Sequence, residues 1–260
     1  MPSLDDHQSD QYVKTLWVGN SGSGKTGGLA PLALAGYRLH ILDFDNGLDA
    51  LKNLIRAASP EKLKNVDFES LQDLYTASPM GPIVKGPPKA FVGAVKLLDK
   101  WSDGSTPASW GSEHVLVIDS LTNFGRAAFA WARALNPSYK TPQLWYGDAQ
   151  KAIEDVMALL TNAAFCTNVI VISHMESQEQ PDGSSKTFAT AIGKALGPKL
   201  PRFFNNMIMT ESLGIGNNVR RTIRTQPTAA IDLKNAAPVK VAPSYPIESG
   251  ILDIFKALRA

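Results

Sequence analysis

The eight residues from Gly19 to Thr26 carry the clearest chemistry in this sequence, because their spacing is Gly-x-x-x-x-Gly-Lys-Thr. A loop of this kind lets backbone N–H groups and a helix N-terminus point at phosphate oxygens. Lys25 is spaced to bridge the β- and γ-phosphates of a nucleoside triphosphate, and the Thr26 hydroxyl to bind Mg²⁺. The sequence contains no Asn-Lys-x-Asp motif for reading guanine, which favours ATP. The residues predicted to bind ATP are Gly19, Asn20, Ser21, Gly22, Ser23, Gly24, Lys25 and Thr26.

Carboxylates at two other places could complete this site. Asp119 ends the apolar run 114–118 and is predicted to help Thr26 hold Mg²⁺, with a helix cap as the alternative role. Hydrolysis also needs a group that activates water, but Ser120 stands where many P-loop ATPases have a glutamate. We predict that Asp45 is this base, supported by Asp43, because residues two apart share one side of a strand end.

The elements that must position these residues alternate between strands and helices. Strands are predicted over residues 13–18, 38–42, 66–68, 114–119 and 168–173, and helices over 88–101, 124–135 and 143–162. A helix should also follow the phosphate-binding loop to about residue 35, kinked by Pro31. Residues 207–213 and 221–226 read as a hairpin around a turn at 214–218. This order predicts an α/β fold with a mainly parallel sheet flanked by helices and an antiparallel hairpin at one edge.

Length and composition are those of a globular protein. The 260 residues are 44% apolar and 19% charged, which excludes a wholly disordered chain. We divide the sequence into a flexible tail (1–12), an ATPase domain (13–235), and a linker with a short amphipathic C-terminal helix (236–260). No apolar run is long enough to span a membrane and the start is acidic, so we expect a cytoplasmic protein with no membrane partner.

The pairing of 42–45 with 117–120, followed by an apolar strand ending in Ser173 and His174, resembles the RecA-type ATPase core. It is most similar to the small phage-encoded RecA-like ATPases of the Sak type, which are associated with single-strand annealing and recombination. The similarity covers roughly residues 13–228. The family's catalytic glutamate falls on Asp45, a shorter carboxylate, and its γ-phosphate-sensing glutamine falls on His174. The resemblance thus implies an ATPase that uses Lys25, Asp45 and His174, with ATP and Mg²⁺ as its cofactors.

The same resemblance implies partners. Residues 176–199 are similar to the mobile DNA-binding loop of RecA-like proteins, with Lys186, Lys194 and Lys199 as phosphate contacts for single-stranded DNA. Basic residues gather there, since residues 184–224 hold seven Lys and Arg against one Glu, a local net charge of +6. RecA-type sites are usually completed by a cation from an adjacent subunit, which implies a homo-oligomer, ring or filament. The candidate cations are Lys194, Lys199, Arg220 and Arg221. A role in phage DNA recombination, in the host cytoplasm, would also bring a single-strand DNA-binding protein as a partner.

Two other function classes stay open. A small-molecule kinase uses the same phosphate-binding loop, but it would need several arginines in a lid, and residues 176–199 contain none. An ATP-switched scaffold with little turnover is the other alternative, because Asp45 and His174 both depart from the family's pattern.

Overall fold

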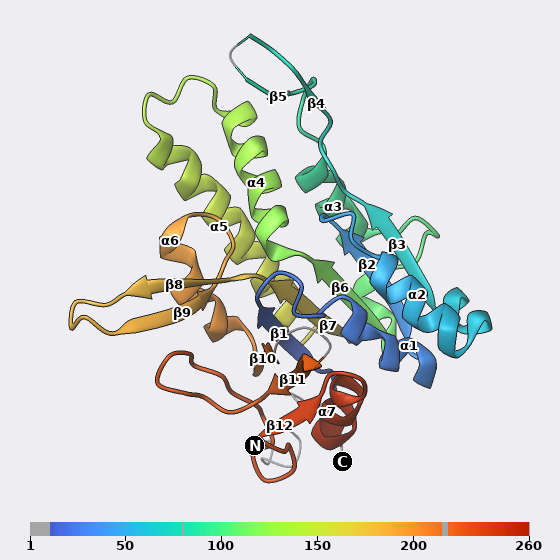
Figure 1. Cartoon of the computed structure of the whole chain (residues 1–260). Helices are drawn as coiled ribbons and strands as arrows, with labels where there is room; N and C mark the ends of the chain where they lie inside the picture. The colour runs from blue at the N-terminus through green and yellow to red at the C-terminus, as the bar shows by residue number, and fades with distance from the viewer. Residues whose placement is uncertain (1–10, 80, 215–217, 260) are drawn as a thin grey trace, which may run out of the picture.

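The central feature of the fold is an eight-stranded sheet in the order β12-β11-β10-β1-β7-β6-β2-β3 (Figure 1). The computed structural model describes residues 11–79, 81–214 and 218–259. The expected tail falls mostly in residues 1–10, and the middle of the expected turn in 215–217, both outside the described residues. The strands of the sheet are β1 (Lys14–Gly19), β2 (Arg38–Asp43), β3 (Val66–Ser70), β6 (Gly111–Asp119), β7 (Thr167–Ser173), β10 (Asn206–Leu213), β11 (Arg220–Arg224) and β12 (Ser244–Pro246).

The sheet is parallel except at one edge. β3, β2, β6, β7, β1 and β10 run in the same direction, whereas β11 and β12 pair antiparallel beyond β10. The predicted α/β fold class, with a mainly parallel sheet flanked by helices and an antiparallel hairpin at one edge, is confirmed. β7 lies between β1, which leads into the phosphate-binding loop, and β6, which ends at Asp119. Both functional segments therefore emerge at the same edge of the sheet.

Helices cover both faces of the sheet because its strands are apolar on both sides. In β1, Leu16 packs into one core and Trp17 into the other, as the alternation of a strand requires. The helices of the first face are α3 (Ala90–Asp99), α4 (Leu121–Leu135), α5 (Pro142–Thr161) and α6 (Gly193–Leu196). Those of the second face are α1 (Ala30–Ala35), α2 (Asp49–Ala58) and α7 (Gly250–Arg259). The 3-10 segments are η2 (Gly27–Leu29), η3 (Pro60–Asn65), η4 (Pro107–Ser109) and η5 (Gly197–Phe203).

Three segments differ from what the sequence predicts. Residues 176–199 form no long loop, because β8 (Met175–Glu179) pairs antiparallel with β9 (Ser185–Ala189), and α6 and η5 follow. The expected linker at 236–246 includes β12, which extends the sheet. The helix after the phosphate-binding loop begins as the 3-10 segment and continues as α1. Pro31 lies in the first turn of α1, where a backbone N–H has no partner within the helix, so its missing N–H costs no helical hydrogen bond. The C-terminal helix α7, which the sequence predicts, packs against the core on the face of the sheet that α1 and α2 cover.

No helix among the described residues is both long and apolar enough to cross a membrane.

A buried histidine lies at the amino-terminal end of the parallel strands. The Nε2 atom of His40 lies 2.9 Å from Nδ1 of His114, and its ring stacks on Trp110 with 3.9 Å between ring centroids. Burial lowers the pKa of His40 to about 4, and the charges of His114 and Arg38 lower it further, while Asp67 and Asp103 oppose this. The folded state therefore holds His40 neutral at physiological pH.

We expect the free energy of unfolding to fall as the pH falls from 7 to 5. The unfolded chain protonates His40 near its ordinary pKa of about 6.5, while the folded chain does so only near 4, so the unfolded state binds more protons in that window. The loss attributable to His40 is about 2 kcal/mol by pH 5. Urea unfolding of the parent and of His40→Phe at pH 7 and pH 5 checks this. Equal pH dependence in the two proteins would contradict it.

Candidate functional site

The phosphate-binding loop is built so tightly that it accepts glycine at defined positions. A Cβ on Gly19 would lie 2.9 Å from the carbonyl oxygen of Thr210, so no side chain fits there. Gly24 has a φ of +96°, a conformation that other residues rarely adopt. The hydroxyl of Ser23 is buried and has no partner among the described residues, which leaves a polar atom in the cradle for a ligand to satisfy.

The side chain of Lys25 is held over this loop by backbone carbonyl groups of the loop itself. Its Nζ donates hydrogen bonds to the carbonyl oxygens of Gly19 and Asn20, both at 2.8 Å. Burial lowers the pKa of Lys25 to about 8, while the negative charges of Asp119 and Asp45 act in the opposite direction. An arriving phosphate would add negative charge at this point and so favour the charged ammonium.

Two oxygen ligands suited to Mg²⁺ lie in contact beside Lys25. The hydroxyl of Thr26 donates to Oδ2 of Asp119 at 2.7 Å, across 93 residues of sequence. Burial raises the pKa of Asp119 to about 6, and the Thr26 hydrogen bond opposes the rise. A buried carboxylate with acidic neighbours is stabilised by a cation, and hydroxyl and carboxylate oxygens are ligands that Mg²⁺ prefers. Thr26 and Asp119 therefore fit the ion, which when bound neutralises phosphate charge.

Asp45 is fixed by hydrogen bonds from Ser120 and Asn123, residues for which the sequence predicts no role at the site. Its Oδ1 accepts hydrogen bonds from the Ser120 backbone at 3.2 Å, the Ser120 hydroxyl at 2.8 Å and Nδ2 of Asn123 at 2.8 Å. Asn123 could have been suspected, because it lies in the first turn of α4, which begins shortly after β6 ends at Asp119. The three bonds hold one carboxylate oxygen of Asp45 and leave Oδ2 for another partner.

Asp43 shapes the turn that presents Asp45. Its Oδ1 accepts from the backbone N–H groups of Asp45 at 3.1 Å and Asn46 at 2.8 Å, and Asn46 has a positive φ of 54°. Burial raises the pKa of Asp43, and the backbone hydrogen bonds counteract the rise. The side chain of Asp43 thus holds the backbone turn that presents Asp45.

His174 lies at the end of β7, next to this group. Its Nδ1 lies 3.2 Å from Oγ1 of Thr122, and its backbone N–H points to the same oxygen. Burial lowers its pKa, and the positive charge of Lys25 lowers it further, while Asp45 raises it. The structure therefore brings Lys25, Thr26, Asp45, Asp119 and His174 to one place.

A cavity of about 560 Å³ opens beside the loop, large enough for a nucleoside. Arg221 and Ile247 approach from β11 and the segment after β12, and a Cβ on Gly24 would lie 3.0 Å from Cδ of Arg221. Arg221 thus lies beside the loop of its own chain, although it is exposed, as Arg220 is. The lining also includes Gly27, Gly28, Ala30, Pro31, Leu34, Ala50, Leu54, Ala58 and Glu248.

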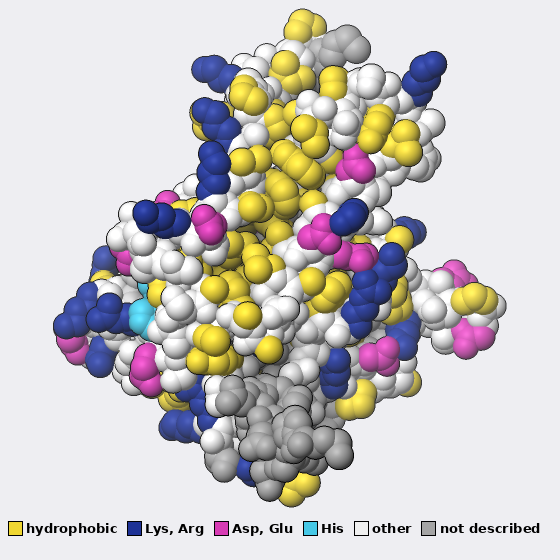
Figure 2. Space-filling model, turned by 180° about the vertical axis from the view of Figure 1, so that it is seen from behind, with side chains coloured by type: hydrophobic (Ala, Val, Ile, Leu, Met, Phe, Trp, Pro, Cys, Tyr) yellow, Lys and Arg dark blue, Asp and Glu magenta, His cyan; other side chains and the backbone are white. Residues whose placement is uncertain are grey.

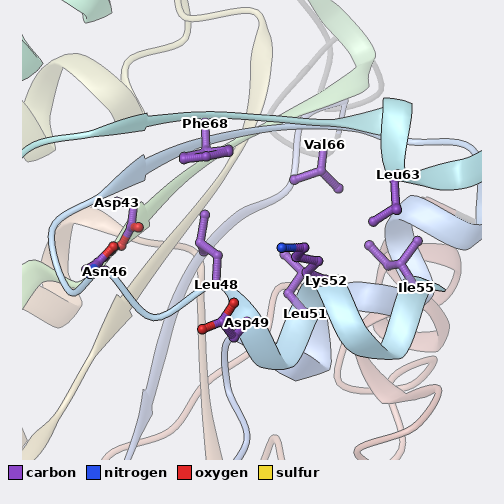
Figure 3. A pocket seen from close by; sticks show the side chains of 10 residues that line it. All are labelled: Asp43, Asn46, Leu48, Asp49, Leu51, Lys52, Ile55, Leu63, Val66 and Phe68. Carbon is purple, nitrogen blue, oxygen red and sulfur yellow. Dashed lines mark hydrogen bonds between the residues drawn. The ribbon is translucent and has the colours of Figure 1, made fainter. Parts of the chain in front are cut away.

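A second cavity, of about 410 Å³, lies between α2 and the edge strand β3 (Figure 3). Asp43 and Asn46 line one end, and the side chains of Leu48, Val66 and Phe68 make its walls apolar. Asp43, which holds the turn that presents Asp45, therefore also borders this second cavity.

None of the three lysines predicted to contact DNA lines the cavity beside the phosphate-binding loop. Lys186, on β9, forms an ion pair with Asp232 at 2.6 Å, and Lys199, in η5, forms one with Glu154 at 3.4 Å. Lys194, in α6, is exposed. The hairpin of β8 and β9 also carries acidic side chains, so it is less basic than the sequence stretch suggests.

Fold and site together define a P-loop domain of the nucleotide-binding class. The chain belongs to the AAA domain family, whose profile matches residues 11–237. None of the curated proteins matches the sequence.

Solved structures similar to this chain include three proteins of low sequence identity. A RadB recombinase is 16% identical with a TM-score of 0.45, covering 82% of this chain and 79% of its own. A KaiC-like protein from Pyrococcus horikoshii OT3 is 11% identical with a TM-score of 0.44, covering 90% of both chains. The flagellar accessory protein FlaH from Methanocaldococcus jannaschii is 11% identical with a TM-score of 0.46, covering 92% of this chain and 87% of its own.

Proposed function

We propose that this protein binds Mg·ATP, hydrolyses it, and binds single-stranded DNA in a nucleotide-dependent way. The observation that carries the ATPase is the gathering of Lys25, the Thr26–Asp119 pair and the oriented carboxylate of Asp45 around one phosphate-binding loop. Transfer of a phosphoryl group to water needs a cation that binds the phosphates, ligands for Mg²⁺ and a group that activates the water. Lys25, the Thr26–Asp119 pair and Asp45 have the chemistry for these three parts in turn.

In the proposed reaction, Asp45 accepts a proton from the attacking water. Its Oδ1 is occupied by Ser120 and Asn123, so Oδ2 is the oxygen that faces the water. Lys25 leaves its backbone carbonyls and binds the phosphates, where its charge offsets the negative charge of the transferring group. His174 contacts the γ-phosphate side of the site as a neutral donor, which its lowered pKa favours.

The DNA-binding part of the proposal rests on connectivity and on the family resemblance. β8 begins at Met175, directly after His174, and its residue Gln178 pairs with Lys186 of β9, so a change at the γ-phosphate can reach Lys186 through the hairpin. Lys194 and Lys199 follow in α6 and η5. We infer from the resemblance that this binding serves phage DNA recombination or annealing in the host cytoplasm, alongside a single-strand DNA-binding protein.

Filter binding tests the proposal directly. We expect oligo(dT) to be retained more with a non-hydrolysable ATP analogue than without nucleotide, and retention to fall steeply as salt rises. Lys25→Ala should lose the nucleotide effect, whereas Lys64→Ala, an exposed lysine in η3, should keep it. Absence of retention at low salt with the analogue present would refute DNA binding.

An ATP-operated switch with little turnover is the second candidate, and one observation favours it. Three hydrogen-bond donors hold the short side chain of Asp45, which limits its approach to a water molecule. In that case ATP binding alone would change the state of the protein.

We also infer a homo-oligomer, ring or filament, in which a cation from one subunit reaches the ATP site of the next. Arg220 is exposed one residue from Arg221, which lies beside Gly24. Size-exclusion chromatography with ATP analogue and DNA should show assembly, and a monomer under every condition would refute it.

A further inference from the structure

A hairpin and a helix at the edge of the molecule together present a row of lysines. β4 (Tyr75–Thr76) and β5 (Ile83–Val84) form a short hairpin that stands clear of the sheet, and α3 follows it (Figure 1). We define the α3 lysine row as the exposed residues Lys85, Lys89, Lys96 and Lys100. None of the four forms an ion pair within the described part of the chain, unlike Lys186 and Lys199.

Three of the four lysines follow one line along α3, because Lys96 lies within the helix and Lys89 and Lys100 are the residues that flank it. An α-helix turns 100° per residue, so Lys89, Lys96 and Lys100 fall within about 40° of one another. With a rise of 1.5 Å per residue, their Cα atoms are spaced by about 10 Å and then about 6 Å along the axis. A column of Lys and Arg side chains is visible along this edge when the molecule is viewed from behind (Figure 2).

Large apolar side chains stand exposed beside the row. Tyr75 is 66% exposed and Leu74 70% exposed. The backbone of Lys85 donates to the carbonyl of Leu74 at 2.7 Å, and Asp73 accepts from the backbone N–H of Lys89 at 2.6 Å. These bonds, with the pairing of Tyr75 and Val84, hold the backbone on either side of Tyr75 next to the chain that carries Lys85 and Lys89.

We propose that the α3 lysine row, with Tyr75, is a binding surface for single-stranded DNA. A row of unpaired cations beside an exposed aromatic ring fits a flexible polyanion whose bases can stack. A flat anionic membrane fits less well, because Lys100 lies about 16 Å along α3 from Lys89, away from the protruding hairpin. This inference rests on the proposed DNA binding but assigns it to a surface other than Lys186, Lys194 and Lys199.

The test compares oligo(dT) affinity across a salt series. Four phosphate contacts predict a slope of about −2.8 in log affinity against log salt, and each lysine removed reduces its magnitude by about 0.7. We therefore expect Lys96→Gln/Lys100→Gln to reduce the slope by about 1.4. The matched control is Lys64→Gln/Lys256→Gln, which removes two exposed lysines beside the opposite core and should leave the slope unchanged. Tyr75→Ala should weaken binding about 5- to 150-fold, and Tyr75→Phe should restore it.

The outcomes separate this inference from the proposed function. If the protein binds oligo(dT) and the row variants match the parent, the row is not the DNA surface, and Lys186→Gln/Lys194→Gln then tests the β8–β9 hairpin and α6. If the parent retains no DNA, both proposals fail. If the row variants instead lose binding to vesicles of phosphatidylserine while DNA is never bound, the surface belongs to a membrane and the inference is overturned.

Discussion

Lys25→Ala is expected to weaken ATP binding about 10- to 100-fold. The Lys25 ammonium is held by two carbonyls at the mouth of the phosphate-binding loop, and its charge-assisted bonds to phosphate would be among the strongest in the site. Alanine removes this charge and leaves the loop backbone in place, because both carbonyls can hydrogen-bond to water. Isothermal titration calorimetry of Mg·ATP with parent and variant measures the difference.

Lys64→Ala is the matched control, because it removes an exposed lysine away from the loop and should bind ATP as the parent does. The hydrolysis rate of Lys25→Ala should also fall to the background of the assay. An affinity equal to the parent's would mean that the phosphates bind elsewhere.

The phosphate-binding loop and its sheet are predictable from local sequence. The motif at Gly19–Thr26 encodes backbone geometry directly, and buried parallel strands read as apolar runs such as 114–118. Asp119 follows from the same logic, because strand ends at one edge of a parallel sheet meet the ligand.

The rest of the site depends on pairings that the sequence does not reveal. Arg221 and Ile247 come beside Gly24 only because β11 and β12 extend the sheet past β10, some 200 residues along the chain. The β8–β9 hairpin is polar and lacks a clear alternating pattern, so it reads as a loop. At its base Met175 lies opposite Ala189, and both side chains pack against the core that holds Leu16.

The local charge around Lys186 and Lys199 also cannot be predicted from the sequence alone. Counting charges along 184–224 gives a basic stretch, yet Asp232 and Glu154 come from outside it and pair with Lys186 and Lys199. The α3 lysine row is likewise not evident from the linear sequence. Its four residues are spread over sixteen positions, and only helical geometry places three of them on one face.

Asp45→Asn is expected to reduce ATP hydrolysis about 10²- to 10⁴-fold while ATP affinity stays within a few-fold of the parent's. The amide oxygen of asparagine can still accept from Ser120 and Asn123, so the turn should keep its shape. What is lost is the ability to accept a proton from water.

Single-turnover hydrolysis and calorimetry on the same samples separate these effects. Asn123→Ala should lower the rate less, because it removes one of the three donors that orient Asp45 and leaves the carboxylate itself. The two variants together distinguish enzyme from switch. If Asp45→Asn hydrolyses ATP at the parent's rate and that rate is near background, ATP binding alone is the functional event. A parent rate well above background that survives the substitution would instead move the base to another residue.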